Sequence, residues 1–257
     1  MFEEPYRWIE AVRNRREYLE EQLTSGSPII GLPYQNGIVL TTLGTGASKL
    51  FEIYDQIAFG GLGHPTDLEK LRTTVLEIAH VEGFNRSPSD VNLQRLIKFG
   101  IAPLVKQAFE EVLHAPYIAK LLFTEISIPS GQPLFLRLAY DGMFEESKTF
   151  GVLAPTAIMA HQMEKFLNQQ GTTASLPLTQ AVQIALRTWA LSLISSSRSE
   201  AKEEELPQKD FIDSLLKEKL PKLALEVAVL DRSQPGTSKF RSLSKKENQS
   251  LLKEWIK

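Results

Sequence analysis

Short apolar runs separated by turn residues fill residues 27–63. The runs cover residues 29–32, 37–42, 50–54 and 57–61. Asn36-Gly37 separates the first two runs, and an Asn-Gly pair supplies the positive φ angles that a tight two-residue hairpin turn requires. Apolar runs of this length bounded by turn residues predict strands. Residues 27–63 are therefore predicted to open an antiparallel sheet whose two faces are both largely apolar.

Apolar residues at helical spacing predict a helix at the start of the chain, over residues 3–23. Trp8, Val12 and Leu19 form its apolar stripe, while arginine and glutamate side chains occupy the opposite face. Pro5 suits the first turn, where a helix needs no N–H from that residue. The pattern by itself predicts a surface helix with a solvated charged face, and contact with a partner helix in a ring requires further evidence.

The same spacing predicts further helices along the chain. Their ranges are 66–81, 91–113, 156–169, 178–194 and a short 211–220, followed by a last helix that ends near residue 256. Thr66 with Glu69, and Ser244 with Glu247, fit the capping-box pattern of a helix start. Pro103 predicts a bend within 91–113. The residues predicted to face inward in 156–169 are Ile158, Met163, Phe166 and Leu167.

The remaining apolar runs predict strands over residues 117–128, 134–140, 150–153 and 223–231. Pairs of helices between groups of antiparallel strands predict a layered α+β domain with helices on both sheet faces. No internal repeat is visible, and a chain of this length can form one large domain as readily as two. The polar and charged tract at 195–209 is predicted to be a mobile loop.

Composition and charge exclude several classes of function. The chain has 257 residues, 42% of them hydrophobic, which is enough to bury a full core. The formal net charge is -2, so bulk electrostatics gives no basis for binding nucleic acid or an anionic membrane. The chain has no cysteine, which excludes disulfides and thiolate chemistry, and no apolar run approaches the ~20 residues of a membrane span. These features predict a soluble cytoplasmic protein.

No pattern in the sequence predicts a metal or a cofactor. Glu77 and His80 have a helical spacing that suits a metal, but no third ligand accompanies them. Gly60, Gly61 and Gly63 lack the Gly-Lys-Ser/Thr of a phosphate-binding loop and the full dinucleotide fingerprint, so they are predicted to permit close packing of a strand against a helix. Core or interface anchors are predicted at the tryptophans, which are Trp8, Trp189 and Trp255.

Five segments together resemble one protein family. In chain order they are EPYRWIEAVRNRREYLEEQL, KLFEIYDQIAFGGLG, LEKLRTTVLEIAHVEGFNRSPSDVNLQRL, LRLAYDG and LEVAVLD. In this order and spacing the chain resembles the α-type subunits of bacterial, actinobacterial-like 20S proteasomes. The resemblance implies the proteasome-like N-terminal-nucleophile hydrolase fold, which is a four-layer αββα sandwich, formed by residues 1–257 as a single domain. It also implies a homo-heptameric outer ring that caps rings of proteolytic β subunits in protein degradation.

The resemblance further implies that this chain is not itself a protease. The β-type mechanism uses an N-terminal threonine, freed by cleavage, whose own amine acts as the base. The matching position here is Ser27, and the position of the required aspartate falls on Leu43. A helix also stands where β subunits have a removable propeptide. The alternative, a self-processing peptidase or amidohydrolase with Ser27 or Thr24 as its nucleophile, stays open at this point.

Two residues are implied to bind an activator. In α-type subunits the lysine that matches Lys49 binds the C-terminal carboxylate of an activator ATPase, a charge-assisted contact. Gly26 is implied to contribute a backbone amide to the same pocket. From the residues alone, Lys49 is equally an exposed, solvated lysine at the start of a strand. Residues 1–7 are implied to form a gate at the pore, although they lack the Tyr-Asp-Arg pattern of archaeal and eukaryotic α subunits.

Overall fold

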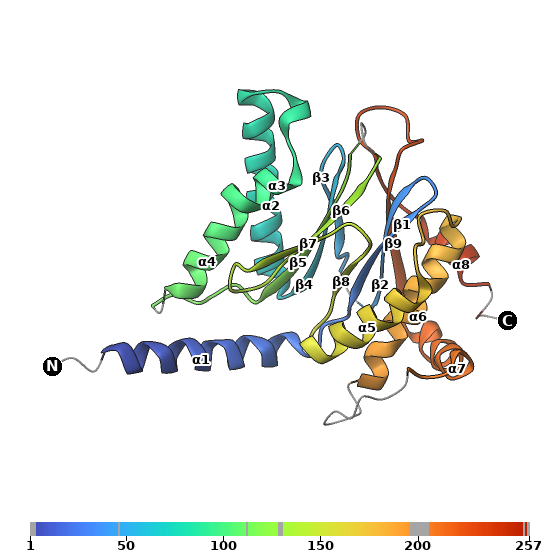
Figure 1. Ribbon diagram of the computed structural model, residues 1–257, viewed down its shortest axis with the longest axis horizontal. Helices are drawn as coiled ribbons and strands as arrows, with labels where there is room; N and C mark the ends of the chain where they lie inside the picture. Colours follow the sequence, from blue (N-terminus) through green and yellow to red (C-terminus); the bar gives the residue numbers. More distant parts are fainter. Residues whose placement is uncertain are drawn as a thin grey trace.

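Two antiparallel β-sheets face each other at the centre of the molecule (Figure 1). The structure, a computed structural model, describes residues 4–45, 47–111, 113–127, 131–195, 206–253 and 255. The first sheet contains β1 (Ile29–Tyr34), β2 (Gly37–Gly44), β8 (Gly151–Leu153), β9 (Ala224–Asp231) and β10 (Phe240–Ser242). The second contains β3 (Leu50–Tyr54), β4 (Ile57–Gly63), β5 (Ala119–Ile126), β6 (Pro133–Leu138) and β7 (Phe144–Ser147). Across the described residues the strand orders are β10-β9-β2-β1-β8 and β3-β4-β5-β6-β7.

Helices cover the outer face of each sheet and extend from one end (Figure 1). The helices are α1 (Glu4–Leu23), α2 (Pro65–Asn85), α3 (Leu93–Arg95), α4 (Ala102–Glu110), α5 (Ala157–Gln170), α6 (Leu178–Ser195), α7 (Lys209–Lys219) and α8 (Lys245–Leu251). Helices α2 to α4 pack on the second sheet, and α5 to α8 pack on the first. Helix α1 lies along one end of the sandwich and projects beyond it.

The buried side chains show why both faces of the early strands are apolar. Every residue of β1 is buried, because one face of the strand packs on the opposite sheet and the other packs on helices. Leu122 and Phe135 fill the space between the sheets, whereas Trp189 and Val229 belong to the layer under α6. The expected α+β fold with four αββα layers is therefore confirmed.

The first hairpin has its turn where the sequence predicts it, but glycine has a different role there. Tyr34 pairs with Gly37, so Gln35 and Asn36 are the two turn residues and Gly37 belongs to the strand. A Cβ atom at Gly37 would lie 1.9 Å from the carbonyl oxygen of Leu230 in β9. Glycine is required at position 37 because the neighbouring strand passes too close for a side chain.

The capping box predicted at Thr66 is wrong. Helix α2 begins at Pro65, and its N-cap is His64, which makes no side-chain capping bond. The chain leaves β4 through Gly63 at φ 142°, and the His64 N–H then donates to Ile118 O at 2.8 Å. This connection to β5 sets the helix start earlier than the local cap pattern suggests. The box at Ser244 and Glu247 is confirmed.

Local pattern also misplaced two apolar side chains. Ile158 is 61% exposed, and its neighbour Met159 points into the core, because Thr156 caps α5 and fixes which face turns inward. Trp8 is 45% exposed, so it is no core anchor of its own subunit, whereas Trp189 and Trp255 are both 4% exposed.

Strands β7 and β10 were not predicted, since neither is a long apolar run.

The bend expected at Pro103 takes the form of a π-helical segment, Leu96–Ile101, just before α4. Proline has no N–H to donate to the preceding turn, which accounts for the wider spacing.

Of the tract 195–209, which is expected to be mobile, residues 196–205 lie outside the described residues, and Lys209 already begins α7. No described helix is long and apolar enough to cross a membrane.

Candidate functional site

The residues singled out by the sequence gather at the α1 end of the sandwich, where α1 leads into β1. The Gly26 N–H donates to Leu23 O at 3.0 Å and closes the last turn of α1. A Cβ atom at Gly26 would lie 2.7 Å from the side chain of Leu62 in β4. The amide of Gly26 is therefore engaged within the chain, and the missing side chain lets the junction approach the second sheet.

Ser27 follows directly and makes two side-chain hydrogen bonds. Its hydroxyl donates to the backbone carbonyl of Leu43, and it accepts a bond of 2.8 Å from the indole N–H of Trp189 in α6. The side chain of Leu43 is fully buried in an apolar cluster. Because a serine hydroxyl has one proton, donation to Leu43 O uses the proton that a nucleophile must lose to a base.

Thr24 is similarly engaged. Its hydroxyl donates to Glu20 O at 2.9 Å within the last turn of α1. Within the described part of the chain, neither Thr24 nor Ser27 has a side-chain bond to a carboxylate, an imidazole or an amine. In the uncleaved chain, both hydroxyls are therefore bonded to backbone or indole groups and not to a base.

Lys49 lies half-buried just before β3, beside this junction. Its backbone carbonyl accepts a bond of 3.1 Å from the N–H of Gly61, which fixes it against β4. Its Cε and Nζ atoms both lie 4.0 Å from the position that a Cβ atom would take on Gly44. Burial lowers the pKa of the Lys49 ammonium, and the nearby carboxylate of Glu226 opposes that shift. No hydrogen bond to this ammonium is found among the described residues.

A cavity of about 610 Å³ lies on the other side of the α1–β1 junction, between the end of α1, β5, β6, β8 and the start of α5. Two cations stand in its wall. Lys120 donates to Pro155 O at 2.6 Å and to Ala154 O at 3.4 Å. Arg137 donates to Val152 O at 3.2 Å. Burial lowers the pKa of Lys120, whereas Glu20 opposes the shift.

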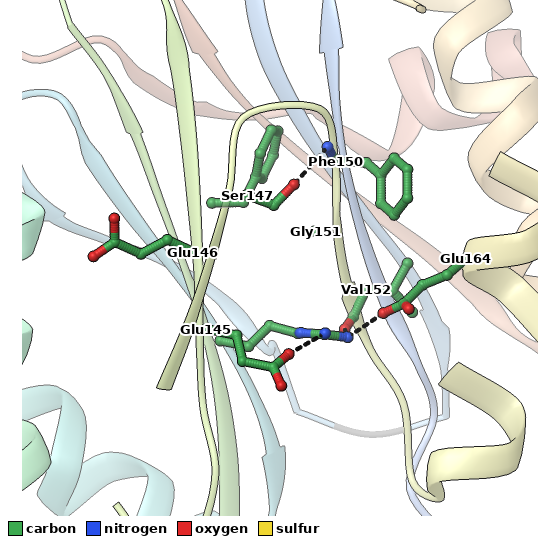
Figure 2. Close-up of a pocket in the computed structure, with 9 residues that line it drawn as sticks. Glu145, Glu146, Ser147, Phe150, Gly151, Val152 and Glu164 are labelled. Atoms are coloured by element: carbon green, nitrogen blue, oxygen red, sulfur yellow. Dashed lines mark hydrogen bonds and ion pairs between the residues drawn. The ribbon is translucent and has the colours of Figure 1, made fainter. Parts of the chain in front are cut away.

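A smaller adjoining cavity of about 220 Å³ shows how Arg137 is held. The Arg137 guanidinium is ion-paired with the carboxylates of Glu145 and Glu164. Figure 2 shows these two glutamates on opposite sides of the pocket, each with a dashed line to its ion pair. The carbonyl of Val152 belongs to β8, which is an edge strand of the first sheet. Lys120 and Arg137, both from the second sheet, therefore satisfy carbonyls along and just after that open edge. Their bonding is structural, and it leaves neither cation arranged around a ligand.

The histidines and the glycine triplet were considered as a metal site and a phosphate-binding loop. The histidines are exposed on separate elements, and the described residues contain no group of three or more His, Asp or Glu side chains placed to hold a metal. A Cβ atom at Gly61 would lie 2.6 Å from the side chain of Leu68 in α2. One at Gly63 would lie 2.0 Å from Ile118 O. The predicted close packing of this strand against a helix is confirmed at Gly61, whereas Gly63 packs against the backbone just before β5.

Helix α1 is anchored through one part of its surface and leaves another exposed. Leu19 and Leu23 are buried. Arg15 donates to Phe109 O in the last turn of α4 at 2.8 Å, and to Glu111 O just after α4 at 2.9 Å. The exposed large apolar residues of α1 are Trp8 at 45%, Ile9 at 65% and Tyr18 at 48%. The helix is a platform that its own subunit covers only in part.

Sequence reasoning missed two partners at this end of the molecule. Trp189 was predicted as an anchor, but its bond to Ser27 joins residues 162 positions apart and has no local signal. Glu226 was not singled out. It is the one charged residue between Leu225 and Leu230 in an otherwise apolar strand, and that isolation was the available signal.

Several bacterial proteins are similar in sequence to this chain along most of its length. No protein-family model matches the chain. It is 27% identical over 245 residues to the proteasome subunit alpha of Actinosynnema mirum, which covers 95% of this chain and 84% of that protein. It is 26% identical to the proteasome subunit alpha of Saccharomonospora viridis, over 94% of this chain and 86% of that protein. The identity to the proteasome subunit alpha of Streptosporangium roseum is also 26%, over 95% of this chain and 83% of that protein. Over nearly its whole length, the chain is therefore similar in sequence to proteins named as the α subunits of bacterial proteasomes.

Proposed function

We propose that this chain is a non-catalytic subunit of a bacterial 20S proteasome core particle, in which separate β subunits carry the threonine-protease activity. The observation that carries the proposal is the state of the nucleophile position. Ser27 lies behind a helix of 20 residues, and its hydroxyl is bonded to Leu43 O. The β-type mechanism needs a free amine on the nucleophile itself, and it needs an acidic neighbour where Leu43 stands. The self-processing alternative has neither feature.

Within the particle, the chain forms the homo-heptameric outer ring. Helix α1 supports this role, because it projects from the sandwich with large apolar side chains exposed. Exposed apolar surface of this kind is typical of a contact with another protein. Residues 1–7, at the free end of this helix, form the gate of the ring. Of them, residues 1–3 lie outside the described part of the chain.

The outer face of the ring docks the C-termini of an activator ATPase. Lys49 supplies an ammonium that is half-buried and close to the bare backbone of Gly44. A cation in partly desolvated surroundings is suited to a carboxylate. The Gly26 amide already bonds Leu23 O within the chain, so the docking proposal rests on Lys49 and not on a bond from Gly26.

The first experiment is an intact mass of the chain recovered from particles assembled with its β partner. We expect the full-length mass, with Ser27 internal. Loss of residues 1–23 or 1–26 would identify Thr24 or Ser27 as a processed N-terminal nucleophile and would overturn the proposal. Peptidase assays on Ser27→Ala particles provide the second measurement, and we expect activity equal to that of wild type.

A further inference from the structure

Glu226 of β9 makes contacts that the packing of its own strand does not require. It pairs in register with Thr42 of β2, within the first sheet. Its carboxylate nevertheless reaches the start of β3 in the second sheet. Oε1 accepts bonds from the Ser48 hydroxyl, from the Lys49 N–H at 3.1 Å and from the Leu50 N–H at 3.1 Å. Oε2 accepts a second bond from the Lys49 N–H, at 3.0 Å.

We propose that Glu226 is the positioning residue of the Lys49 docking site, an inference that rests on the proposed function. One carboxylate holds three consecutive residues, Ser48 to Leu50, by their backbone or hydroxyl donors. Hydrogen bonds to a charged group are among the strongest that a chain makes. They fix the backbone from which the Lys49 side chain departs, so the ammonium stays beside Gly44 and accessible to a ligand.

The same contacts decide how a ligand carboxylate is held. The N–H groups of Lys49 and Leu50 already donate to Glu226, so neither is free to donate to an incoming carboxylate. The ligand then interacts with the Lys49 ammonium as its charged donor. The Glu226 charge also favours the protonated lysine, against the burial that lowers its pKa. Glu226 thus acts through Lys49 and makes no contact with the ligand.

The test uses assembled particles and a pair of peptides with the sequence of the last ten residues of the activator ATPase. One peptide ends in a free carboxylate and the other in an amide, and binding is followed by fluorescence anisotropy. We expect Lys49→Ala to weaken the carboxylate peptide about tenfold, to the level of the amide peptide. Glu226→Ala is expected to weaken it about fivefold. Glu226→Gln is expected to stay within about twofold of wild type, because the amide oxygen can accept the bonds from Ser48, Lys49 and Leu50 that Oε1 accepts, and only the second bond from Lys49 is lost.

The double variant Lys49→Ala/Glu226→Ala separates positioning from general support of the fold. If Glu226 acts through Lys49, the double variant binds no more weakly than Lys49→Ala. An added loss in the double variant would overturn the inference, and so would wild-type binding by Glu226→Ala. Equal losses with Ala and Gln would mean that charge rather than position matters, which also contradicts it. An unchanged affinity in Lys49→Ala would instead refute the proposed docking function.

Glu52 provides the matched control. It is a half-buried carboxylate in β3 that accepts a bond of 2.5 Å from the Ser238 hydroxyl. Glu52→Ala removes a comparable bond without touching Ser48, Lys49 or Leu50, and we expect unchanged peptide binding. If Glu226→Ala does not assemble, Ser48→Ala removes a single donor to the same carboxylate. A loss of about twofold would then support the inference, and no loss would contradict it.

Discussion

At the residue scale, Ser27 forms a structural junction within the fold. Ser27 connects three parts of the fold, since it lies between α1 and β1, donates to β2 and accepts from α6. The sequence identifies Ser27 and Leu43 through the resemblance, because both fall at fixed spacings from the first hairpin. It does not reveal Trp189 or Glu226 as partners. Each acts on residues more than a hundred positions away, at 162 positions for Trp189 and up to 178 for Glu226.

Removal of the Ser27 hydroxyl tests this structural role. In Ser27→Ala the carbonyl of Leu43 and the indole N–H of Trp189 both lose a partner in a largely buried position. A buried polar group left without a partner costs about 1–3 kcal/mol, so we expect the free energy of unfolding to fall by about that amount. Urea unfolding of the purified chain measures it.

The exposed neighbour Ser25 is the control for that measurement. Ser25→Ala is expected to change the free energy of unfolding by less than about 0.5 kcal/mol. Equal stability of the two variants would mean that the Ser27 bonds contribute nothing, and the junction would then be held by apolar packing alone.

At the element scale, periodicity located the helices well and their orientation less well. Helical spacing is a local property, so α1, α5 and α6 lie within a residue or two of their expected ranges. The direction in which a face points depends on caps and on neighbouring strands. Thr156 turns Ile158 outward, and the bond from His64 to β5 replaces the cap expected at Thr66. Where cap and sequence pattern agree, as in α8, the prediction is confirmed.

The capping box of α8 carries a measurable pH dependence. Bonds from the Ser244 N–H, the Arg241 guanidinium and the Ser244 hydroxyl lower the pKa of Glu247 to about 2. The ordinary value is 4.5, so the folded state binds the proton less readily than the unfolded state. The stabilisation from Glu247 is therefore complete above about pH 5 and is lost as the pH falls from about 4.5 towards 2.

Carboxyl NMR titration of Glu247 measures this shift directly. We expect a midpoint near 2 in the wild type and a midpoint closer to the ordinary value in Ser244→Ala/Arg241→Ala, which keeps only the backbone donor. Identical Glu247 midpoints in the two chains would contradict the assignment of the shift to these side chains.

At the scale of the whole molecule, the order of the elements predicts the layers. It does not predict the side-chain contacts that join the edge of one sheet to the other. Alternating pairs of helices and groups of strands already predict helices on both faces. The bonds of Lys120 and Arg137 were not predicted, because a single charge in an apolar run marks an unusual residue without indicating which distant groups it will contact. Only the assembled sandwich brings Arg137 to the edge carbonyl of Val152, and to the carboxylates of Glu145 and Glu164.

Ring formation is the property of the whole molecule that α1 should control. Trp8 continues the stripe of Val12 and Leu19, yet it is 45% exposed, and the adjacent Ile9 is 65% exposed. Leu19 and Leu23, the buried apolar residues of α1, both lie in its second half. The first half therefore has apolar surface available for a neighbouring copy. Large aromatic and aliphatic side chains of this kind contribute most to protein interfaces.

Trp8→Gln/Ile9→Gln should therefore prevent assembly without unfolding the subunit. Native mass spectrometry is expected to show a heptamer or larger particle for the wild type and mostly single chains for the double variant. Because both side chains are exposed, the free energy of unfolding of the single chain should change by less than about 1 kcal/mol. The matched control is Arg13→Gln/Glu17→Gln, which removes an exposed ion pair of 4.0 Å on the same helix and should still assemble. Assembly of the Trp8/Ile9 variant at wild-type levels would mean that neighbouring copies meet through another surface, and α1 would then have no role in holding the ring together.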